Sequence, residues 1–158
     1  MSSDLRLDML DSLQDIDDLL VTYGALFDSV KQKEPDVVEL AALGTVLHSF
    51  YNGIEGVFLL VAKQIDKDVP SVPTWHQALL SQMVLSTEER MCVVSLEAAT
   101  ALASYMKFRH FFRHAYSFML DWGRLAPLVE ELHSVWATVR SEINVFIDSL
   151  EADASSTL

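Results

Sequence analysis

The sequence predicts an all-α fold, an antiparallel bundle of four long helices with one short connecting helix. Apolar residues recur at helical spacing in several long segments, and no alternating strand pattern or hairpin signal competes with them. The 158 residues, 51% of them hydrophobic, suffice to bury one core. We therefore expect a single helical domain over residues 1–151 and a flexible tail over residues 152–158.

The first helix is expected to precede the break at Lys31–Pro35. Aspartates occupy one side of this segment, and they fit either a solvated face or a docking surface for a basic partner. The opposite side carries the apolar positions, which are Leu5, Met9, Leu13, Ile16, Leu20, Tyr23, Phe27 and Val30.

A second long helix is predicted by a seam of apolar residues spaced by three or four, namely Leu43, Leu47, Phe50, Ile54, Val57 and Val61. Gly53 and Gly56 lie within it, and each costs roughly 1 kcal/mol relative to alanine in a helix interior. Close backbone packing is the expected compensation. The longest uninterrupted apolar run, Val57–Ala62, is too short to cross a bilayer.

The segment Asp66–Pro73 is predicted to be a loop. Thr74–Gln77 has the pattern of a capping box that opens a short helix ending at about Leu80 or Val84. Ser86–Glu89 has the same pattern and is expected to open the next long helix.

Asp121–Gly123 is expected to form a turn before the last helix, and Pro127 suits that helix's first turn. The final apolar stripe consists of Leu128, Leu132, Val135, Val139, Ile143, Phe146 and Leu150.

The charge of the chain is distributed unevenly. There are 23 acidic and 11 basic side chains, which give a formal net charge of −12. Between Glu97 and Asp121, however, no carboxylate occurs. That interval holds a cationic cluster of Lys107, Arg109, His110, Arg113 and His114. A local cationic surface with imidazoles is where chemistry on a polyanion can occur in an acidic protein.

Cys92 is the only cysteine, which excludes an internal disulfide and a zinc knuckle built on cysteines. No basic start followed by an apolar segment marks a secretory signal. We therefore expect a cytoplasmic protein. The high hydrophobic content is assigned to a subunit interface.

Arg109, His114 and Tyr116 form the pattern R-x-x-x-x-H-x-Y, and on this motif the sequence resembles the HEPN superfamily, within it the HepT-like toxins. The likeness extends from about Ala41 to Leu128. It includes the segments Leu47–Glu55, Trp75–Leu80 and Leu120–Trp122.

The resemblance implies a HEPN-like helical domain and a metal-independent endoribonuclease that acts as a homodimer without a cofactor. It implies that the protein is the toxin of a toxin–antitoxin pair, with Arg109 and His114 as catalytic residues. It also implies that an MNT-type nucleotidyltransferase antitoxin adenylylates Tyr116. His110 stands where many family members carry Asn or Asp. The RNA target is left open among tRNA, mRNA and rRNA.

The chemistry can also be reasoned from the residue types. Metal-free RNA cleavage uses the 2′-hydroxyl as nucleophile, and an imidazole suits the task of taking its proton. Arg109 can clamp phosphate oxygens in a bidentate manner. Arg113, His110 and Lys107 fit either substrate binding or a solvated face.

Helix geometry constrains this site. Five residues turn a regular helix by about 500°, which leaves Arg109 and His114 about 140° apart in projection. We therefore expect a cleft at a dimer axis to which both chains contribute. The pairs Arg109 with Tyr116, and His110 with His114, are expected to share helix faces.

Each of these residues also has a plainer interpretation. His114 can be a structural histidine, Arg109 a salt-bridge partner and Tyr116 a core aromatic. Phe108, Phe111 and Phe112 are expected in the core or an interface.

A metal site and a non-enzymatic function are the alternatives. His110 and His114 have the spacing of two metal ligands, with a third from Asp121, His133 or another chain. No Glu lies between them, and we expect no metal. A helical module that binds a nucleotidyltransferase or a nucleotide without cleaving RNA is the alternative function. His48, His76 and His133 are expected to be structural or solvent-facing, and Glu55 is a candidate for orienting a motif side chain.

Overall fold

A computed structural model describes residues 3–116 and 119–156, and this part of the chain contains helices and no strand. The all-helical prediction is therefore confirmed. The helices are α1 (Ser3–Thr22), α2 (Gly24–Val30), α3 (Val37–Val61), the π-helix η1 (Ala62–Asp66), α4 (Trp75–Val84), α5 (Leu96–His114) and α6 (Trp122–Ser156).

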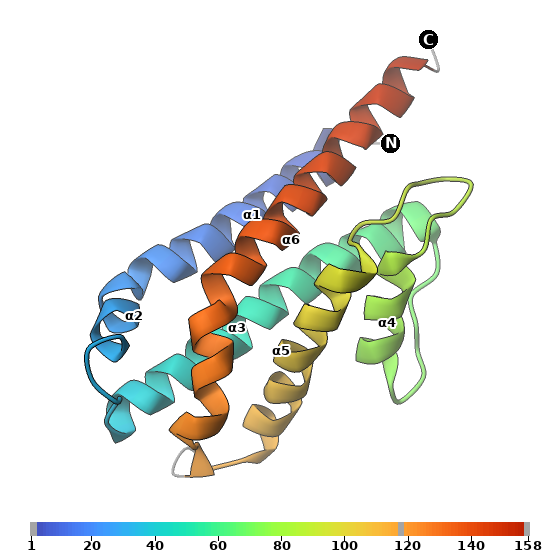
Figure 1. The fold of residues 1–158 in the computed structure, drawn as a ribbon. Coiled ribbons are helices and arrows are strands. Elements are labelled where there is room, and N and C mark those ends of the chain that lie inside the picture. The colour runs from blue at the N-terminus through green and yellow to red at the C-terminus, as the bar shows by residue number, and fades with distance from the viewer. Residues whose placement is uncertain (1–2, 117–118, 157–158) are drawn as a thin grey trace.

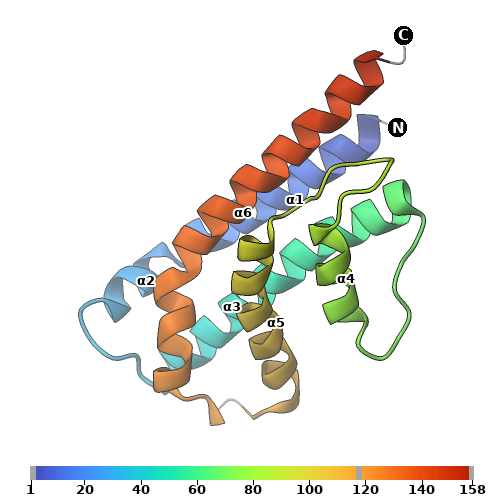
Figure 2. The same cartoon turned by 45° about the vertical axis from the view of Figure 1, so that its right-hand side comes forward.

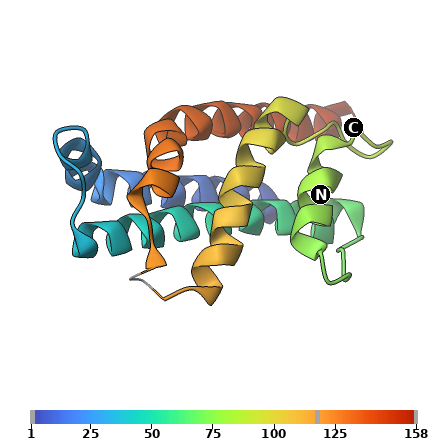
Figure 3. The ribbon, with the colours of Figure 1, turned by 60° about the horizontal axis from the view of Figure 1, so that its bottom comes forward.

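The helices α1 and α6 lie side by side, and the two chain ends lie at the same end of the molecule (Figures 1 and 2). Asp17 joins them, because its carboxylate accepts hydrogen bonds from Trp136 Nε1 at 2.7 Å and Arg140 Nε at 2.9 Å. Seen from below, α5 lies between α4 and the first turns of α6 (Figure 3). One hydrophobic core contains residues from each of the six α-helices.

The predicted first helix is two helices. α1 ends at Thr22, Tyr23 leaves helical geometry with φ −99° and ψ 16°, and α2 begins at Gly24. Glycine is a poor helix former, so the chain can break here at little cost. The break leaves Phe27 buried in the core, with its ring 4.8 Å from that of His133.

The central helix α3 starts at a reciprocal cap. Asp36 Oδ1 accepts a hydrogen bond from the Glu39 amide at 2.8 Å, and Glu39 Oε1 accepts one from the Asp36 amide at 3.3 Å. The helical stretch Val37–Asp66 is long and apolar enough to cross a membrane by length and composition, with a mean hydropathy of 1.2. Its most apolar window is 56% buried inside the bundle, as expected of a core helix.

The two glycines that the sequence analysis singled out in α3 behave differently. A Cβ at Gly53 would lie 2.8 Å from Ile16 Cγ1 of α1, so close packing is confirmed there. A Cβ at Gly56 would meet no described atom within 4 Å, and the prediction is wrong at that position. A third glycine, Gly44, accommodates the ring of Phe112, whose Cε2 would lie 2.9 Å from an added Cβ.

The short helix α4 begins directly after Thr74 and ends at Val84, as predicted, although no cap hydrogen bond to the Thr74 side chain is present in the described structure. The prediction for the next helix is wrong. α5 begins at Leu96 rather than after Ser86, and the Ser95 hydroxyl caps it by accepting from the Ala98 amide at 3.1 Å.

Residues 85–95 form a loop that Arg90 holds in place. The Arg90 side chain is fully buried, and Nε and Nη2 donate to the two oxygens of Asp66 at 2.6 and 2.8 Å. The same guanidinium donates to the carbonyls of Leu85, Met91 and Gln82. Tertiary hydrogen bonds therefore hold this segment in a loop, although its sequence pattern predicted the start of a helix.

The last helix is longer than expected. The predicted turn at Asp121–Gly123 is the start of this helix. α6 begins at Trp122, and Asp121 Oδ1 accepts a hydrogen bond from the Gly123 amide at 3.2 Å. Pro127 lies inside the helix rather than at its first position. α6 continues through Ser156, beyond the predicted domain end, and residues 157–158 lie outside the described part. The flexibility of the tail stays a prediction.

Candidate functional site

Arg109 of α5 is held against the central helix. Its Nε donates a hydrogen bond to Asn52 Oδ1, and its Nη2 lies 4.0 Å from Glu55 Oε1. Only 13% of the Arg109 side chain is exposed. These contacts fix the plane of the guanidinium from the α3 side. Its remaining N–H groups are then oriented to bind an anion.

Glu55 links this arginine to α4. The carboxylate is buried, and its Oε2 lies 2.7 Å from His76 Nδ1. The His76 ring stacks on Trp75 with 3.6 Å between ring centroids. Glu55 was expected to orient a motif side chain, and its place between Arg109 and His76 fits that role.

His48 extends the polar network on the other side. Its Nδ1 lies 3.3 Å from Asn52 Nδ2, and its ring centroid is 5.3 Å from that of Phe112. Burial, followed by the positive charges of Arg109 and Arg113, lowers the pKa of His48. The neutral imidazole is therefore favoured.

Tyr51 lies next to this network and is fully buried. Burial, followed by the negative charge of Glu55, raises its pKa, and the positive charge of Arg109 opposes that change. Its phenol therefore stays protonated and contributes no charge to the site.

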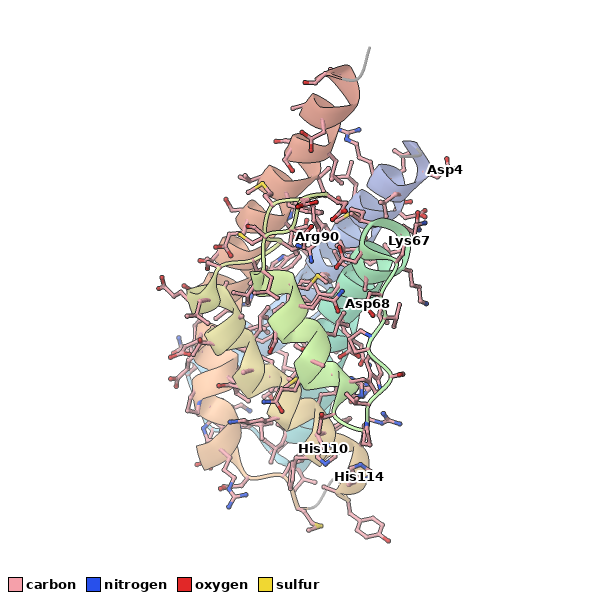
Figure 4. The ribbon with its side chains drawn as sticks, turned by 90° about the vertical axis from the view of Figure 1, so that its right-hand side faces the viewer. Asp4, Lys67, Asp68, Arg90, His110 and His114 are labelled. Carbon is pink, nitrogen blue, oxygen red and sulfur yellow. The ribbon has the colours of Figure 1, made fainter. Side chains whose placement is uncertain are left out.

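His110 and His114 are both exposed, with 4.8 Å between ring centroids. The prediction that they share a face is confirmed. Figure 4 shows the two side chains close together toward the end of α5. Arg109 faces α3, whereas His114 faces solvent beside His110. One chain therefore places these two residues in different surroundings, as the helix geometry predicted.

Tyr116 lies beyond the end of the motif helix. α5 ends at His114, and Ala115 is extended with φ −109° and ψ 149°. The expectation that Tyr116 shares a helix face with Arg109 is therefore wrong. The Tyr116 side chain is 72% exposed. It is consequently accessible to a modifying enzyme, rather than a core aromatic.

The remaining cations of the cluster are exposed. Arg113 lies on the last turn of α5, and Lys107 lies two turns before the end of that helix. The phenylalanines between them belong to the core and its margin, because Phe108 is buried and Phe111 and Phe112 pack partly buried against it. The expectation of core positions is confirmed for these rings.

Lys107, Arg109 and His110 also line a groove between α4 and α5 with a volume of about 770 Å³. His76 lines the same groove from the α4 side. The site thus combines a fixed guanidinium, two exposed imidazoles and an adjoining hollow. These groups can bind anions and exchange protons near neutral pH.

No group of three His, Cys, Asp or Glu side chains able to hold a metal is found within residues 3–116 and 119–156. His133, one candidate for a third ligand, packs against Phe27 instead.

Sequence reasoning missed Asn52 and assigned His48 and His76 only structural or solvent-facing positions. A signal was present, because His48, Asn52 and Glu55 recur at spacings of four and three within a helix that is otherwise mostly apolar. Such a polar stripe on a core helix indicates a buried polar partner. The partner, Arg109, lies 57 positions later than Asn52.

A family profile described as "HepT-like protein" matches residues 42–150. No curated protein and no solved structure matches the chain significantly. The matched range contains most of the central helix, the whole of the short helix α4 and the whole cationic cluster. The chain therefore belongs to the HepT-like family of the HEPN superfamily.

Proposed function

We propose that this protein is the toxin of a toxin–antitoxin pair and acts as a metal-independent endoribonuclease. In this proposal residues 1–151 form one HEPN-like domain, with α1, α3, α5 and α6 as an antiparallel four-helix bundle in a cytoplasmic homodimer. The observation that carries the proposal is the position of Arg109, which Asn52 and Glu55 fix beside exposed imidazoles in a HepT-like chain.

His114 serves as the acid–base group. It takes the proton of the 2′-hydroxyl as that oxygen attacks the adjacent phosphorus, and an imidazolium returns a proton to the leaving 5′-oxygen. The products carry a 2′,3′-cyclic phosphate and a 5′-hydroxyl. Arg109 stabilises the charge that develops on the phosphorane oxygens. Arg113, His110 and Lys107 bind the flanking phosphates.

Two chains complete the site. Because Arg109 and His114 of one chain lie in different surroundings, His114 acts on the phosphate bound by Arg109 of the second protomer. An obligate monomer that retained full activity would rule out this arrangement.

Purified protein incubated with tRNA or total RNA in the presence of a chelator is expected to cut, leaving cyclic-phosphate ends. His114→Ala should abolish the cut, because the group that takes the proton is gone. His133→Ala, which changes an exposed histidine of α6, is the matched control and should cut like wild type. Cutting by the His114→Ala protein at the wild-type rate would defeat the assignment.

The toxin is silenced through Tyr116. An MNT-type nucleotidyltransferase antitoxin transfers AMP from ATP to the phenolic oxygen, with release of pyrophosphate, and the exposure of Tyr116 makes it reachable. Mass spectrometry after incubation with the partner and ATP should place AMP on Tyr116 and on no residue of a Tyr116→Phe protein. Modification elsewhere in the wild-type chain, with Tyr116 untouched, contradicts this role.

One observation favours a non-catalytic alternative, a helical module that binds a nucleotidyltransferase or a nucleotide. Arg109 is largely buried and already engaged by Asn52 and Glu55, as a structural residue would be. Expression of the chain alone separates the two functions. Growth arrest that a neighbouring gene relieves supports the toxin, and unaffected growth supports the module.

A further inference from the structure

The groove between α4 and α5 has the size and the chemistry of a ligand site. Its volume of about 770 Å³ falls within the range usual for small-molecule pockets, roughly 300–1,000 Å³. The two helices run in opposite directions along it. His76 faces Lys107 and His110 at one end, and Val84 and Leu85 face Leu96 at the other.

Its charge selects an anion. Two cations, Lys107 and Arg109, and two imidazoles, His76 and His110, line one end. The buried Glu55 carboxylate contacts His76 and Arg109 from α3, so these two groups are partly compensated and Lys107 supplies further positive charge. Among the described residues that line the groove there is no carboxylate, although the chain carries 23 acidic side chains. An anionic group is therefore favoured here and disfavoured over much of the remaining surface.

The walls next to this charged end suit a flat, partly apolar body. Ala103 and Met106 line the α5 side, and Leu80 lines the α4 side. Gln77 and Ser81 add a side-chain amide and a hydroxyl for hydrogen bonds to the edge of a ring. Small side chains such as Ala103 leave room for a ring, and imidazoles can stack on one.

Arg109 belongs both to this groove and to the proposed phosphate clamp. A nucleotide attached to the clamped phosphate therefore begins at the charged end of the groove. We infer that the groove seats the nucleotide next to the scissile phosphate, with its phosphate at Lys107 and His110 and its base between Leu80 and Ala103. This inference rests on the proposed function, and it requires that the base leave its stack to enter the groove.

The test uses a fluorescent hexaribonucleotide with 2′-O-methyl groups, which binds but cannot be cleaved because the nucleophile is blocked. Ser81→Phe and Ala103→Phe fill the groove from its two walls. Ser104→Phe, on an exposed position of α5 outside the lining, is the matched control. Fluorescence anisotropy is expected to show binding weakened about tenfold by each filling variant, since one stacked base is lost, and unchanged in the control.

Equal affinity of the filled and wild-type proteins would overturn the inference. Competition by free AMP as strong as by unlabelled hexamer would also overturn it, because the groove would then serve a free nucleotide. Should both filling variants misfold, photocrosslinking of a 4-thiouridine hexamer to the wild-type protein decides the question. Crosslinks to the groove walls at Leu80, Ser81 or Ala103 support the site. Crosslinks only elsewhere, including crosslinks confined to the cationic cluster, refute it.

The two proposals fail separately. If the wild-type protein cuts no RNA but binds the uncleavable hexamer in a groove-dependent way, the nuclease assignment is lost and the groove stands. If the protein cuts RNA and groove filling changes nothing, the groove is lost and the nuclease stands.

Discussion

Arg109 is oriented by its neighbours on α3 and α4 more than by its own helix. Asn52 accepts from its Nε, Glu55 lies beside its Nη2, and His76 holds Glu55 from the other side. In the proposed nuclease these are positioning residues, because they act on a phosphate only through the guanidinium. A positive charge at position 109 is therefore insufficient by itself, and the orientation of the guanidinium decides what it can bind.

Glu55→Gln tests this positioning. The neutral amide no longer attracts the guanidinium, so RNA cleavage should fall by about tenfold to a hundredfold, mostly in kcat. Glu97→Gln, on the exposed first turn of α5, is the control and should cleave like wild type. Wild-type kcat in the Glu55→Gln protein would show that the contact has no positioning role.

Gly53 and Gly56 of α3 make a matched pair for stability. Gly53→Ala places a methyl group 2.8 Å from the buried Ile16, and such overpacking costs roughly 1–3 kcal/mol. Gly56→Ala meets open space and should stabilise the helix by about 0.5–1 kcal/mol. Urea denaturation should therefore rank Gly56→Ala above wild type and Gly53→Ala below it. The reverse order would contradict the packing described for α1 and α3.

His48 makes stability depend on pH. Its pKa is lowered in the folded protein from the usual 6.5, so the unfolded chain binds more protons between the two values. The contribution of His48 to the free energy of unfolding is therefore fully present above about pH 6.5. It is lost as the pH falls from there toward the pKa of His48 in the folded protein.

Thermal unfolding of wild type and His48→Gln at about pH 7.5 and about pH 5.5 measures this effect. The wild-type protein should lose more of its free energy of unfolding on acidification than the variant does. His133→Gln, an exposed change, serves as the control. An identical loss in wild type and His48→Gln would show that His48 does not titrate as its surroundings require.

At the scale of elements, two segments with the same capping pattern have different outcomes. Thr74 precedes a helix, whereas Ser86 begins a loop and α5 starts at Ser95. The difference lies in Arg90, which turns inward and binds Asp66 together with three backbone carbonyls. The capping pattern depends only on adjacent residues and carries no information on the contact between Arg90 and Asp66, which are 24 positions apart. The sequence therefore placed this helix start too early.

Arg90→Met tests the tie between the loop and the end of the central helix. Asp66 would keep a nearly buried charge without its partner, so the free energy of unfolding should fall by about 3–5 kcal/mol. Arg124→Met, on the exposed start of α6, is the control and should change stability little.

Adding Asp66→Leu to Arg90→Met should recover part of the loss, because the unpaired charge is then removed as well. Strictly additive losses in the two single variants and the double variant would argue against a coupled pair.

At the scale of the whole molecule, the proposed nuclease requires a second copy, because Arg109 and His114 of one chain lie in different surroundings. Mixing Arg109→Ala and His114→Ala proteins, each inactive alone, tests this directly. A heterodimer keeps one intact pairing of arginine and histidine across the interface. Random exchange should restore roughly a quarter of wild-type cleavage, because half of the dimers carry one good site of two.

Continued inactivity of the mixture, with heterodimers demonstrated by tagged copurification, would contradict a site shared between chains. Dilution below the dimer dissociation constant should reduce wild-type activity for the same reason.

The sequence alone determined the all-helical class, the central helix, the short helix α4, the core phenylalanines and the region of the cationic cluster. Each of these follows from local periodicity or local charge, and both depend only on residues that are close together in the sequence. It also placed the chain near its family from the motif and the segments around it. The family match over residues 42–150 agrees with that reading and extends further toward the C-terminus.

Only the tertiary structure decided which side chains surround Arg109, where α5 begins and ends, and that α4 and α5 enclose a groove. Asn52, Glu55 and His76 reach Arg109 from two other helices, and Tyr116 leaves its face because the helix stops at His114. Such relations depend on contacts between residues that lie tens of positions apart. No periodicity within one helix encodes them, because they arise only when the helices pack.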